Sequence, residues 1–233
     1  IAATLINAGA TGDITLNAGT GAISQDGPDD KTDVTADVLT ADSTTGIDLD
    51  STISSANLSV TGTGSIILDE QDAVALTDID TANGAISVTA GGAITATDLA
   101  SATDNDANDI SLTGNNIAVT LINAGTSGDV TLNAGTGAVT QDGTDDKDDV
   151  TADVLTADAA TGINLDTTVA SSDLSVTGAG SISIDELDAI VLTDLDTANG
   201  TITVTSAGAM TATDIQAGKN NNISLTTTVG DVT

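Results

Sequence analysis

The chain has 233 residues, a formal net charge of −32, and no aromatic, cysteine or histidine residue. Its basic side chains are Lys31, Lys147 and Lys219, against 35 acids. Because most general bases, nucleophiles and cofactor ligands are missing, the composition argues against an enzyme. The negative charge argues against nucleic acid and anionic lipid as partners, and no stretch approaches the roughly 18 apolar residues of a membrane span.

One short element recurs along the chain: an aliphatic–polar–aliphatic triplet, a turn with glycine, and a second aliphatic pair. In chain order it begins at Ile14, less regularly at Val34, then at Leu58, Ile86, Ile110 and Val130. Alternation punctuated by Gly, Asn and Asp is typical of short β-strands joined by turns, and no window has helical periodicity. The sequence therefore predicts an all-β protein.

A longer repeat contains this element. At an offset of 116, the stretch from Leu5 to Asp98 has 67 identities over 94 positions, and the offset falls to 113 near Ile110. We therefore divide the chain into a first β-repeat unit, residues 1–116, and a second, residues 117–233. Five elements per unit give a spacing of about 23 residues.

Short strands at this spacing predict a parallel β-solenoid (β-helix) with coils of about 23 residues, each stacked on the one before. Inward aliphatic residues would form ladders along the axis. The expected ladders stack Ile14, Leu16 and Ile23 near Leu58, Val60 and Ile66, and near Ile86, Val88 and Ile94. The alternative is a tandem pair of β-sandwich domains, although the aromatic core usual in that fold is missing.

The two ends resemble interior parts of the repeat. The chain starts with Ile1 to Leu5, which matches Ile117 to Leu121, and stops at a VGDVT segment similar to the SGDVT segment from Ser127. We interpret the chain as a segment of a longer repetitive protein, or as a unit that associates with identical neighbours. Trimming at arbitrary points is the simpler alternative.

Three runs carry a resemblance to a known class of proteins: LNAGTGAISQDG from Leu16, LTADSTTGIDLD from Leu39 and LSVTGTGSI from Leu58. They resemble the β-strand-repeat regions of giant bacterial surface proteins, the filamentous-haemagglutinin-like and autotransporter-like adhesins. The resemblance extends over the whole chain and implies an exported, right-handed β-helical stalk or fibre. No active-site residue of that family is present to carry over, and the lack of cysteine is compatible with export.

Three kinds of acidic cluster are candidate calcium sites, because Ca²⁺ requires about six to eight oxygen ligands, which alternating Asp and Asn side chains on a turn supply. The candidate metal ligands are Asp26, Asp29 and Asp30 with their equivalents Asp142, Asp145 and Asp146; Asp104, Asp106, Asn108 and Asp109; and Asp78, Asp80 and Asn83 with their equivalents Asp194, Asp196 and Asn199. Asp and Asn are also common turn formers, so a purely structural role is the alternative.

Three classes of function follow from these observations. The first is an extracellular structural repeat protein, forming a surface fibre, filament or adhesin stalk that self-associates or continues in a longer chain and is stabilised by calcium. The second is an ice-binding β-solenoid that uses the Thr-x-Thr runs at Thr201, Thr203 and Thr205 and at Thr211 and Thr213. The third is an enzyme with Asp78 and Asp80 as paired carboxylates, which the lack of aromatic and Arg residues to hold a sugar disfavours.

Overall fold

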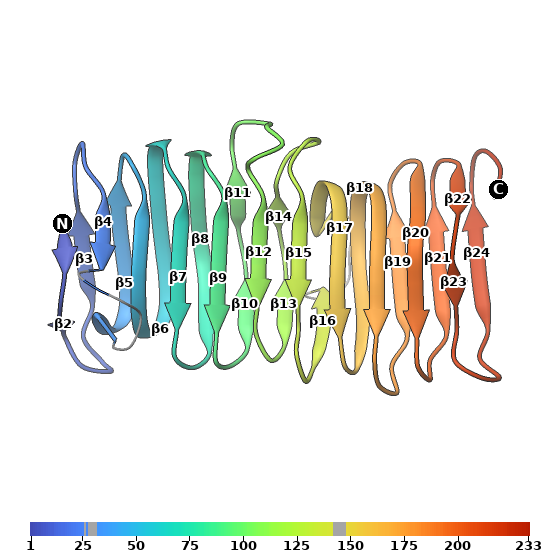
Figure 1. The fold of residues 1–233 in the computed structure, drawn as a ribbon, viewed down its shortest axis with the longest axis horizontal. Coiled ribbons are helices and arrows are strands. Elements are labelled where there is room, and N and C mark those ends of the chain that lie inside the picture. Colours follow the sequence, from blue (N-terminus) through green and yellow to red (C-terminus); the bar gives the residue numbers. More distant parts are fainter. Residues whose placement is uncertain (26, 28–31, 142–147) are drawn as a thin grey trace.

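The structure is a computed structural model, and it describes residues 1–25, 27, 32–141 and 148–233. Across these residues the structure is all-β, and it contains no helix that could span a membrane. Twenty-four described strands join side by side in one sheet, and each pairing between them is parallel. The sheet winds into an elongated solenoid with the two ends of the chain at opposite ends of the rod (Figure 1).

The strands are short where a coil turns and long where the chain bends without breaking its pairing. Those before the repeat boundary are β1 (Ala2–Ala3), β2 (Ile6–Asn7), β3 (Ile14–Asn17), β4 (Ile23–Gln25), β5 (Val34–Ser43), β6 (Ile47–Thr63), β7 (Ile66–Glu70), β8 (Val74–Asn83), β9 (Ile86–Ala90), β10 (Ile94–Ala96), β11 (Leu99–Ser101) and β12 (Ile110–Thr113). Those after it are β13 (Ile117–Val119), β14 (Ile122–Asn123), β15 (Val130–Asn133), β16 (Ala138–Gln141), β17 (Val150–Ala159), β18 (Gly162–Val176), β19 (Ile182–Glu186), β20 (Ile190–Thr197), β21 (Ile202–Ser206), β22 (Met210–Ala212), β23 (Ile215–Gln216) and β24 (Ile223–Thr227).

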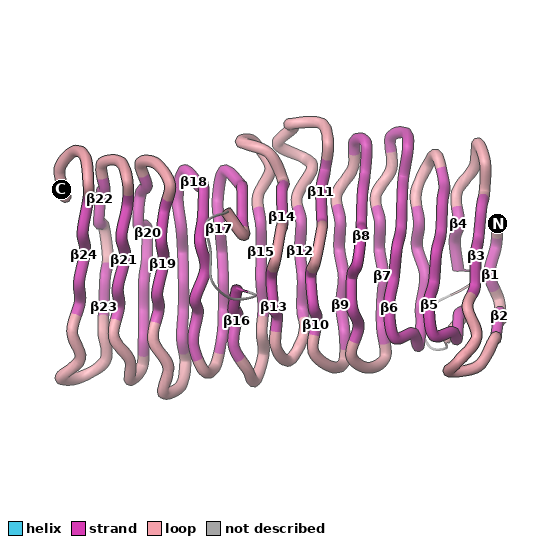
Figure 2. Tube along the Cα trace, turned by 180° about the vertical axis from the view of Figure 1, so that it is seen from behind, coloured by secondary structure: helices cyan, strands magenta, loops and turns pink. Residues whose placement is uncertain are grey.

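A coil is flattened, with its strands in two layers that face each other across the core. One coil consists of β7 in one layer and β8 in the other, and the next consists of β9 followed by β10 and β11, which both pair with β8. Figures 1 and 2 view the two layers from opposite sides. Alternate side chains of each strand point between the layers and their neighbours point to solvent, which explains the strict alternation in the sequence.

The core consists of aliphatic ladders that run along the axis. Two ladders define the layers. The first consists of Ile23, Ile47, Ile66, Ile86, Ile110 and Val130, and the second of Ile94, Ile117, Val139, Ile163, Ile182 and Ile202. Each of these side chains is buried. Because the coils are in register, an aliphatic side chain of one coil packs on an aliphatic side chain of the next. Small aliphatic residues therefore fill the thin core without aromatic ones.

One sequence repeat does not make a whole number of coils. The ladder that starts at Ile23 reaches Val130 after five coils. Val130 is the repeat equivalent of Ile14, whereas the equivalent of Ile23 is Val139, which lies in the other layer. The 116 residues of a repeat therefore make five and a half coils, and the second repeat is rotated by about half a turn around the axis.

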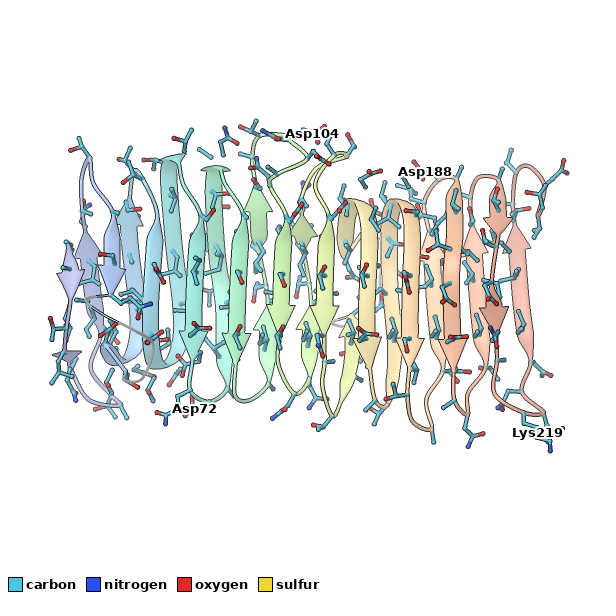
Figure 3. The ribbon with its side chains drawn as sticks, in the orientation of Figure 1. Asp72, Asp104, Asp188 and Lys219 are labelled. Carbon is cyan, nitrogen blue, oxygen red and sulfur yellow. The ribbon has the colours of Figure 1, made fainter. Side chains whose placement is uncertain are left out.

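Equivalent surface residues show this rotation directly. Asp72 and Asp188 are 116 residues apart and occupy the same position in the two repeats. Figure 3 places Asp72 at the lower edge of the solenoid and Asp188 at the upper edge. A surface residue that is common to both repeats therefore occurs twice, on opposite sides of the rod.

The parallel β-solenoid predicted from the sequence is confirmed, and the tandem sandwich is wrong because sandwich strands are antiparallel. The coil length is corrected from about 23 to about 21 residues, the mean for five and a half coils per 116 residues. The repeat boundary falls between β12 and β13, and pairing continues across it without a break.

Part of the expected ladder register is also corrected. Ile23 and Ile66 share a ladder, as expected, but Ile86 follows Ile66 in that ladder, and the predicted neighbour Ile94 lies in the other layer. Ile14 pairs with Leu39 rather than stacking toward Leu58. The triplet recurs after whole coils in some places and after one and a half coils in others, so its copies are divided between the two layers.

Candidate functional site

The predicted carboxylate pair of the first repeat lies on the outer face of β8. Asp78 Oδ2 accepts a hydrogen bond of 3.3 Å from the amide of Asn57, one coil earlier. Partial burial, assisted by the negative charges of Asp78 and Asp98, raises the pKa of Asp80 to about 6. Asp98 comes from the next coil, directly before Leu99, so three carboxylates from two coils share this surface.

The second repeat carries a larger version of this surface on the opposite face. Asp173 on β18 pairs in register with Asp194 on β20, and Ser175 pairs with Asp196. Burial, followed by repulsion from Asp194, raises the pKa of both Asp173 and Asp196. The charge of Asp214 also acts on Asp196. Like charges stacked on adjacent coils repel each other, so this face is destabilised where no cation screens it.

The asparagines of the two clusters are separated from these carboxylates. Asn83 ends β8, and its Oδ1 accepts a hydrogen bond of 3.0 Å from the amide of Asn108. Its equivalent Asn199 accepts one of 3.3 Å from Asn221. Each asparagine therefore links the corner of one coil to the loop of the next, instead of converging with the aspartates of its own cluster.

The loop from residue 103 to 109 is held by its own polar side chains. Asn108 is 2% exposed and donates a second hydrogen bond, of 2.8 Å, to the carbonyl of Thr103. Asp104, at the outer edge in Figure 3, accepts a hydrogen bond of 2.7 Å from Thr126 Oγ1, which lowers the pKa of Asp104. Asn108 is thus an anchor inside the loop, and Asp104 ties the loop to the next coil.

The other two predicted ligands in this loop, Asp106 and Asp109, do not converge on a common point. Asp109 Oδ1 accepts a hydrogen bond of 3.0 Å from the backbone N–H of Asp129 on the following coil, and Asp106 is exposed. Three of the four side chains in the predicted cluster therefore have structural partners, which is the turn-forming role weighed as the alternative.

The third pair of acidic clusters lies outside the described residues. It contains Asp26, Asp29 and Asp30 in the first repeat and Asp142, Asp145 and Asp146 in the second. Among the residues that the structure does describe, no group of three or more acidic side chains has an arrangement that could hold a metal ion. Calcium binding by this chain stays a prediction.

Two buried glutamates form a feature that the sequence analysis did not select. Glu70 is 4% exposed, and its Oε2 accepts hydrogen bonds from Ser51 Oγ at 2.6 Å and from the N–H of Ile53 at 3.1 Å. Its Oε1 accepts another from the N–H of Asp72 at 3.3 Å. One carboxyl group thus joins the end of β7 to a bend in the preceding coil.

The second repeat contains an equivalent arrangement on the opposite face. We call each of these two hydrogen-bonded glutamates, Glu70 and Glu186, a glutamate clasp. Glu186 is 1% exposed and accepts hydrogen bonds from Thr167 Oγ1 at 2.7 Å and from the N–H groups of Val169 and Asp188 at 3.2 and 3.1 Å. Burial raises the pKa of Glu186 to about 8, although its donors act in the other direction. Burial likewise raises the pKa of Glu70. The sequence signal was available, since these are the two Glu residues of the chain and they are 116 positions apart.

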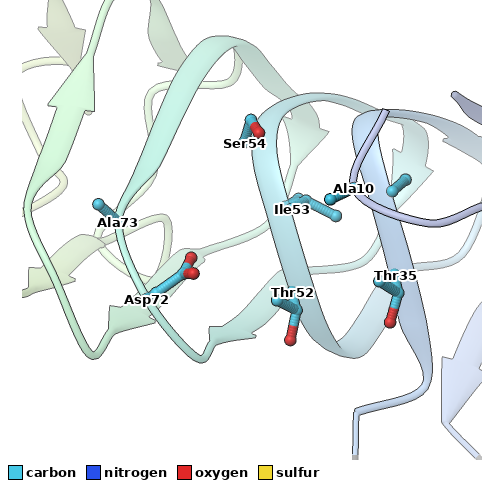
Figure 4. A pocket seen from close by; sticks show the side chains of 8 residues that line it. Ala10, Thr35, Thr52, Ile53, Ser54, Asp72 and Ala73 are labelled. Carbon is cyan, nitrogen blue, oxygen red and sulfur yellow. The ribbon is translucent and has the colours of Figure 1, made fainter. Parts of the chain in front are cut away.

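A shallow groove of about 350 Å³ lies beside the first clasp (Figure 4). Its lining is mostly small residues with one carboxylate. The lining consists of Ala10, Thr35, Ala36, Thr52, Ile53, Ser54, Asp72 and Ala73. Asp72 is the titratable residue of this lining, and its backbone N–H donates to the buried carboxyl group of Glu70.

The Thr-x-Thr run considered for ice binding lies on β21. Thr203 and Thr205 both point outward there, but the residues that pair with them on β19 are Ser183 and Asp185. The pair on β24 is Ser224 and Thr226. The threonine pair is therefore not repeated on the neighbouring coils, and this face does not favour the ice-binding alternative.

Comparison with known proteins identifies no relative: no family model, no curated protein and no solved structure matches the chain.

Proposed function

We propose that the chain is a structural repeat segment, a rigid spacer whose length is set by the number of repeats. One observation carries the proposal: the strands pair across the repeat boundary in the same way as within a repeat. β12 pairs with β15, β10 with β13 and β11 with β14, each parallel and in register. Adding a repeat therefore lengthens the same rod instead of adding a separate bead.

The distribution of polar groups supports a structural role. The buried aliphatic residues form ladders through the described coils, and several polar side chains of the candidate sites form hydrogen bonds to a neighbouring coil. In a repeat array each coil is stabilised mainly by its neighbours, so these links stiffen the rod along its axis.

The test is the length of a designed array. Two copies of the chain joined in tandem would contain four repeats, and each repeat of five and a half coils adds about 26 Å at about 4.8 Å per coil. Small-angle scattering and electron microscopy of the single and the doubled chain should show a rod about 53 Å longer in the second. A bent or beaded particle, or a length that does not grow in proportion, would contradict the proposal.

We further propose that this rod is extracellular, as part of a surface fibre or adhesin stalk. The resemblance of its repeats to giant bacterial surface proteins supports this location, together with the lack of cysteine and the high density of acidic side chains. Immunogold labelling of intact source cells with an antibody against the chain tests it. Labelling that requires permeabilised cells would contradict it.

A further inference from the structure

We infer that the C-terminal edge of the solenoid is a docking surface for the N-terminal edge of a second copy of the chain. The inference rests on the proposed structural role and specifies its partner. The C-terminal edge consists of β22, β23 and β24, and the N-terminal edge of β1, β2 and β3. Among the described residues, β23 and β24 at one edge and β1, β2 and β3 at the other pair with a strand on one side only, so backbone groups on their other side can accept a further strand.

The chain itself contains the interface that these edges would form. At the repeat boundary, β12 and β11 of the first repeat pair with β15 and β14 of the second. β24 and β23 are the repeat equivalents of β12 and β11, and β3 and β2 are the equivalents of β15 and β14. The two open edges are thus matching halves of a junction that already exists inside the molecule.

This equivalence fixes the register of docking. Ile110 pairs with Val130 and Leu112 with Leu132 in the internal junction. The same register pairs Ile223 with Ile14 of the second copy and Leu225 with Leu16 of the second copy. Ile223 is 45% exposed at the open edge, and docking would bury it in an aliphatic ladder.

Two segments can occupy the same strand position in this interface, the one beside β22. Residues 231–233 lie along β22, where Met210 N–H donates to the carbonyl of Asp231 at 3.0 Å and Ala212 N–H donates to that of Thr233 at 2.9 Å. In the internal junction the equivalent place, beside β10, is taken by β13. The equivalent of β13 in the second copy is its β1, so β1 of that copy and residues 231–233 of the first compete for one strand position.

This competition makes a directional prediction. A chain that lacks residues 1–4 retains β2 and β3 for pairing and leaves the contested position to residues 231–233 of its neighbour. It should therefore stack end to end more tightly than the full chain, by tenfold or more in dissociation constant. A chain that lacks both residues 1–4 and residues 230–233 leaves the position empty and should lose this gain.

A matched pair of substitutions tests the docked strand. Thr15 is exposed on β3. The N–H of Ala18 donates to the carbonyl of Asp42 on β5 at 2.9 Å, and successive N–H groups of a strand point in opposite directions, so the N–H of Thr15 points to the open edge. Thr15→Pro removes that donor and should weaken docking about tenfold, because its acceptor in the docked copy would be buried without a hydrogen bond. Thr15→Ala keeps the N–H and should dock like the parent.

The experiment is analytical ultracentrifugation of the full chain and these variants in about 1 M salt, where the Debye length of about 3 Å screens the acidic surfaces. Electron microscopy then measures particle length, and circular dichroism verifies that each variant is folded. Folded chains lacking residues 1–4 that stay monomeric, or side-by-side rather than end-to-end dimers, would overturn the inference. If the covalent tandem array is a straight rod and separate chains do not stack, the docking inference fails and the structural role stands.

Discussion

Glu70 and Glu186 determine how the stability of the solenoid depends on pH. The folded-state pKa of Glu186 is raised to about 8 from an ordinary value of 4.5, so the folded chain keeps a proton that the unfolded chain has released. This stabilisation is fully present below about pH 4.5 and is lost as the pH rises through about 8. The raised pKa of Glu70 acts in the same direction.

We therefore expect the free energy of unfolding to fall between about pH 6 and about pH 8.5, a range in which ordinary aspartates, with pKa values of about 3.9, no longer titrate. The part of the Glu186 contribution that is lost between about pH 6 and about pH 8 corresponds to roughly 3 kcal/mol. Urea denaturation at a series of pH values measures it. Glu186→Gln should flatten the profile, Asp13→Asn, at an exposed site away from both glutamates, should not, and a profile unchanged by Glu186→Gln would refute this role of Glu186.

Ser172 is another buried polar residue, and it lacks the hydrogen bonds that Glu70 and Glu186 have. It is 1% exposed in an aliphatic ladder between Leu155 and Leu192, and its hydroxyl has no hydrogen-bond partner among the residues that the structure describes. The first repeat has Ala56 at the equivalent position. The hydroxyl therefore loses its hydration on folding without a compensating bond.

We expect Ser172→Ala to raise the free energy of unfolding by about 1 kcal/mol, as measured by urea denaturation. The control is Ser101→Ala, because Ser101 Oγ bonds to the carbonyl of Gly84 at 3.1 Å and contacts Thr81 Oγ1 at 3.2 Å. That substitution should destabilise the chain by about 1 kcal/mol or more. Equal destabilisation by both changes would show that the Ser172 hydroxyl has a partner.

At the scale of the elements, the corners between β8 and β9 and between β20 and β21 depend on stacked glycines. A Cβ atom on Gly84 would overlap the carbonyl group of Gly64 on the preceding coil, and one on Gly200 would overlap that of Gly180. The backbones of successive coils approach so closely at these corners that a methyl group has no space. These glycines thus permit the coil spacing that the ladders require.

Gly84→Ala should accordingly destabilise the chain by about 1–3 kcal/mol, the usual range for overpacking, in a thermal or urea unfolding experiment. Gly21→Ala is the matched control, since its nearest atom, the carbonyl oxygen of Ala18, is 3.7 Å from the added Cβ. A Gly84→Ala chain as stable as the control would mean that the corner can open without cost.

At the scale of the whole molecule, the chain carries a net charge of −32, and the half-coil offset places equivalent acids such as Asp72 and Asp188 on opposite edges of the rod. Aspartates pair in register on adjacent coils, as in Asp50 with Asp69, Asp166 with Asp185, and Asp173 with Asp194. Repulsion along these columns opposes folding, and cations reduce it.

We expect Ca²⁺ to raise the melting temperature and a chelator to reverse the increase, as measured by differential scanning calorimetry. Sodium chloride at the same ionic strength is the control, because general screening affects both salts alike and specific coordination by carboxylates affects Ca²⁺ alone. Identical melting curves with Ca²⁺ and with sodium chloride would contradict calcium binding.

The sequence by itself determined the class of fold. Alternating triplets such as Ile86 to Val88, the glycine-rich turns and the 116-residue repeat can be satisfied by stacked coils with an aliphatic interior, and those signals are local in the chain. Turn-forming roles for Asp104 and Asn108 could also be anticipated, because short polar side chains bond to nearby backbone and loop atoms.

Only the tertiary structure decided the register of the coils. Successive paired strands lie from 17 residues apart, as Val34 and Ser51, to 28 apart, as Ile122 and Val150, and this variation depends on which corners turn tightly. The sum of these lengths, five and a half coils per repeat, places Asp72 and Asp188 on opposite edges and buries Glu70 and Glu186 against a neighbouring coil. Sequence periodicity reports the mean spacing of like residues, whereas the face that each residue occupies depends on the accumulated length of every corner before it.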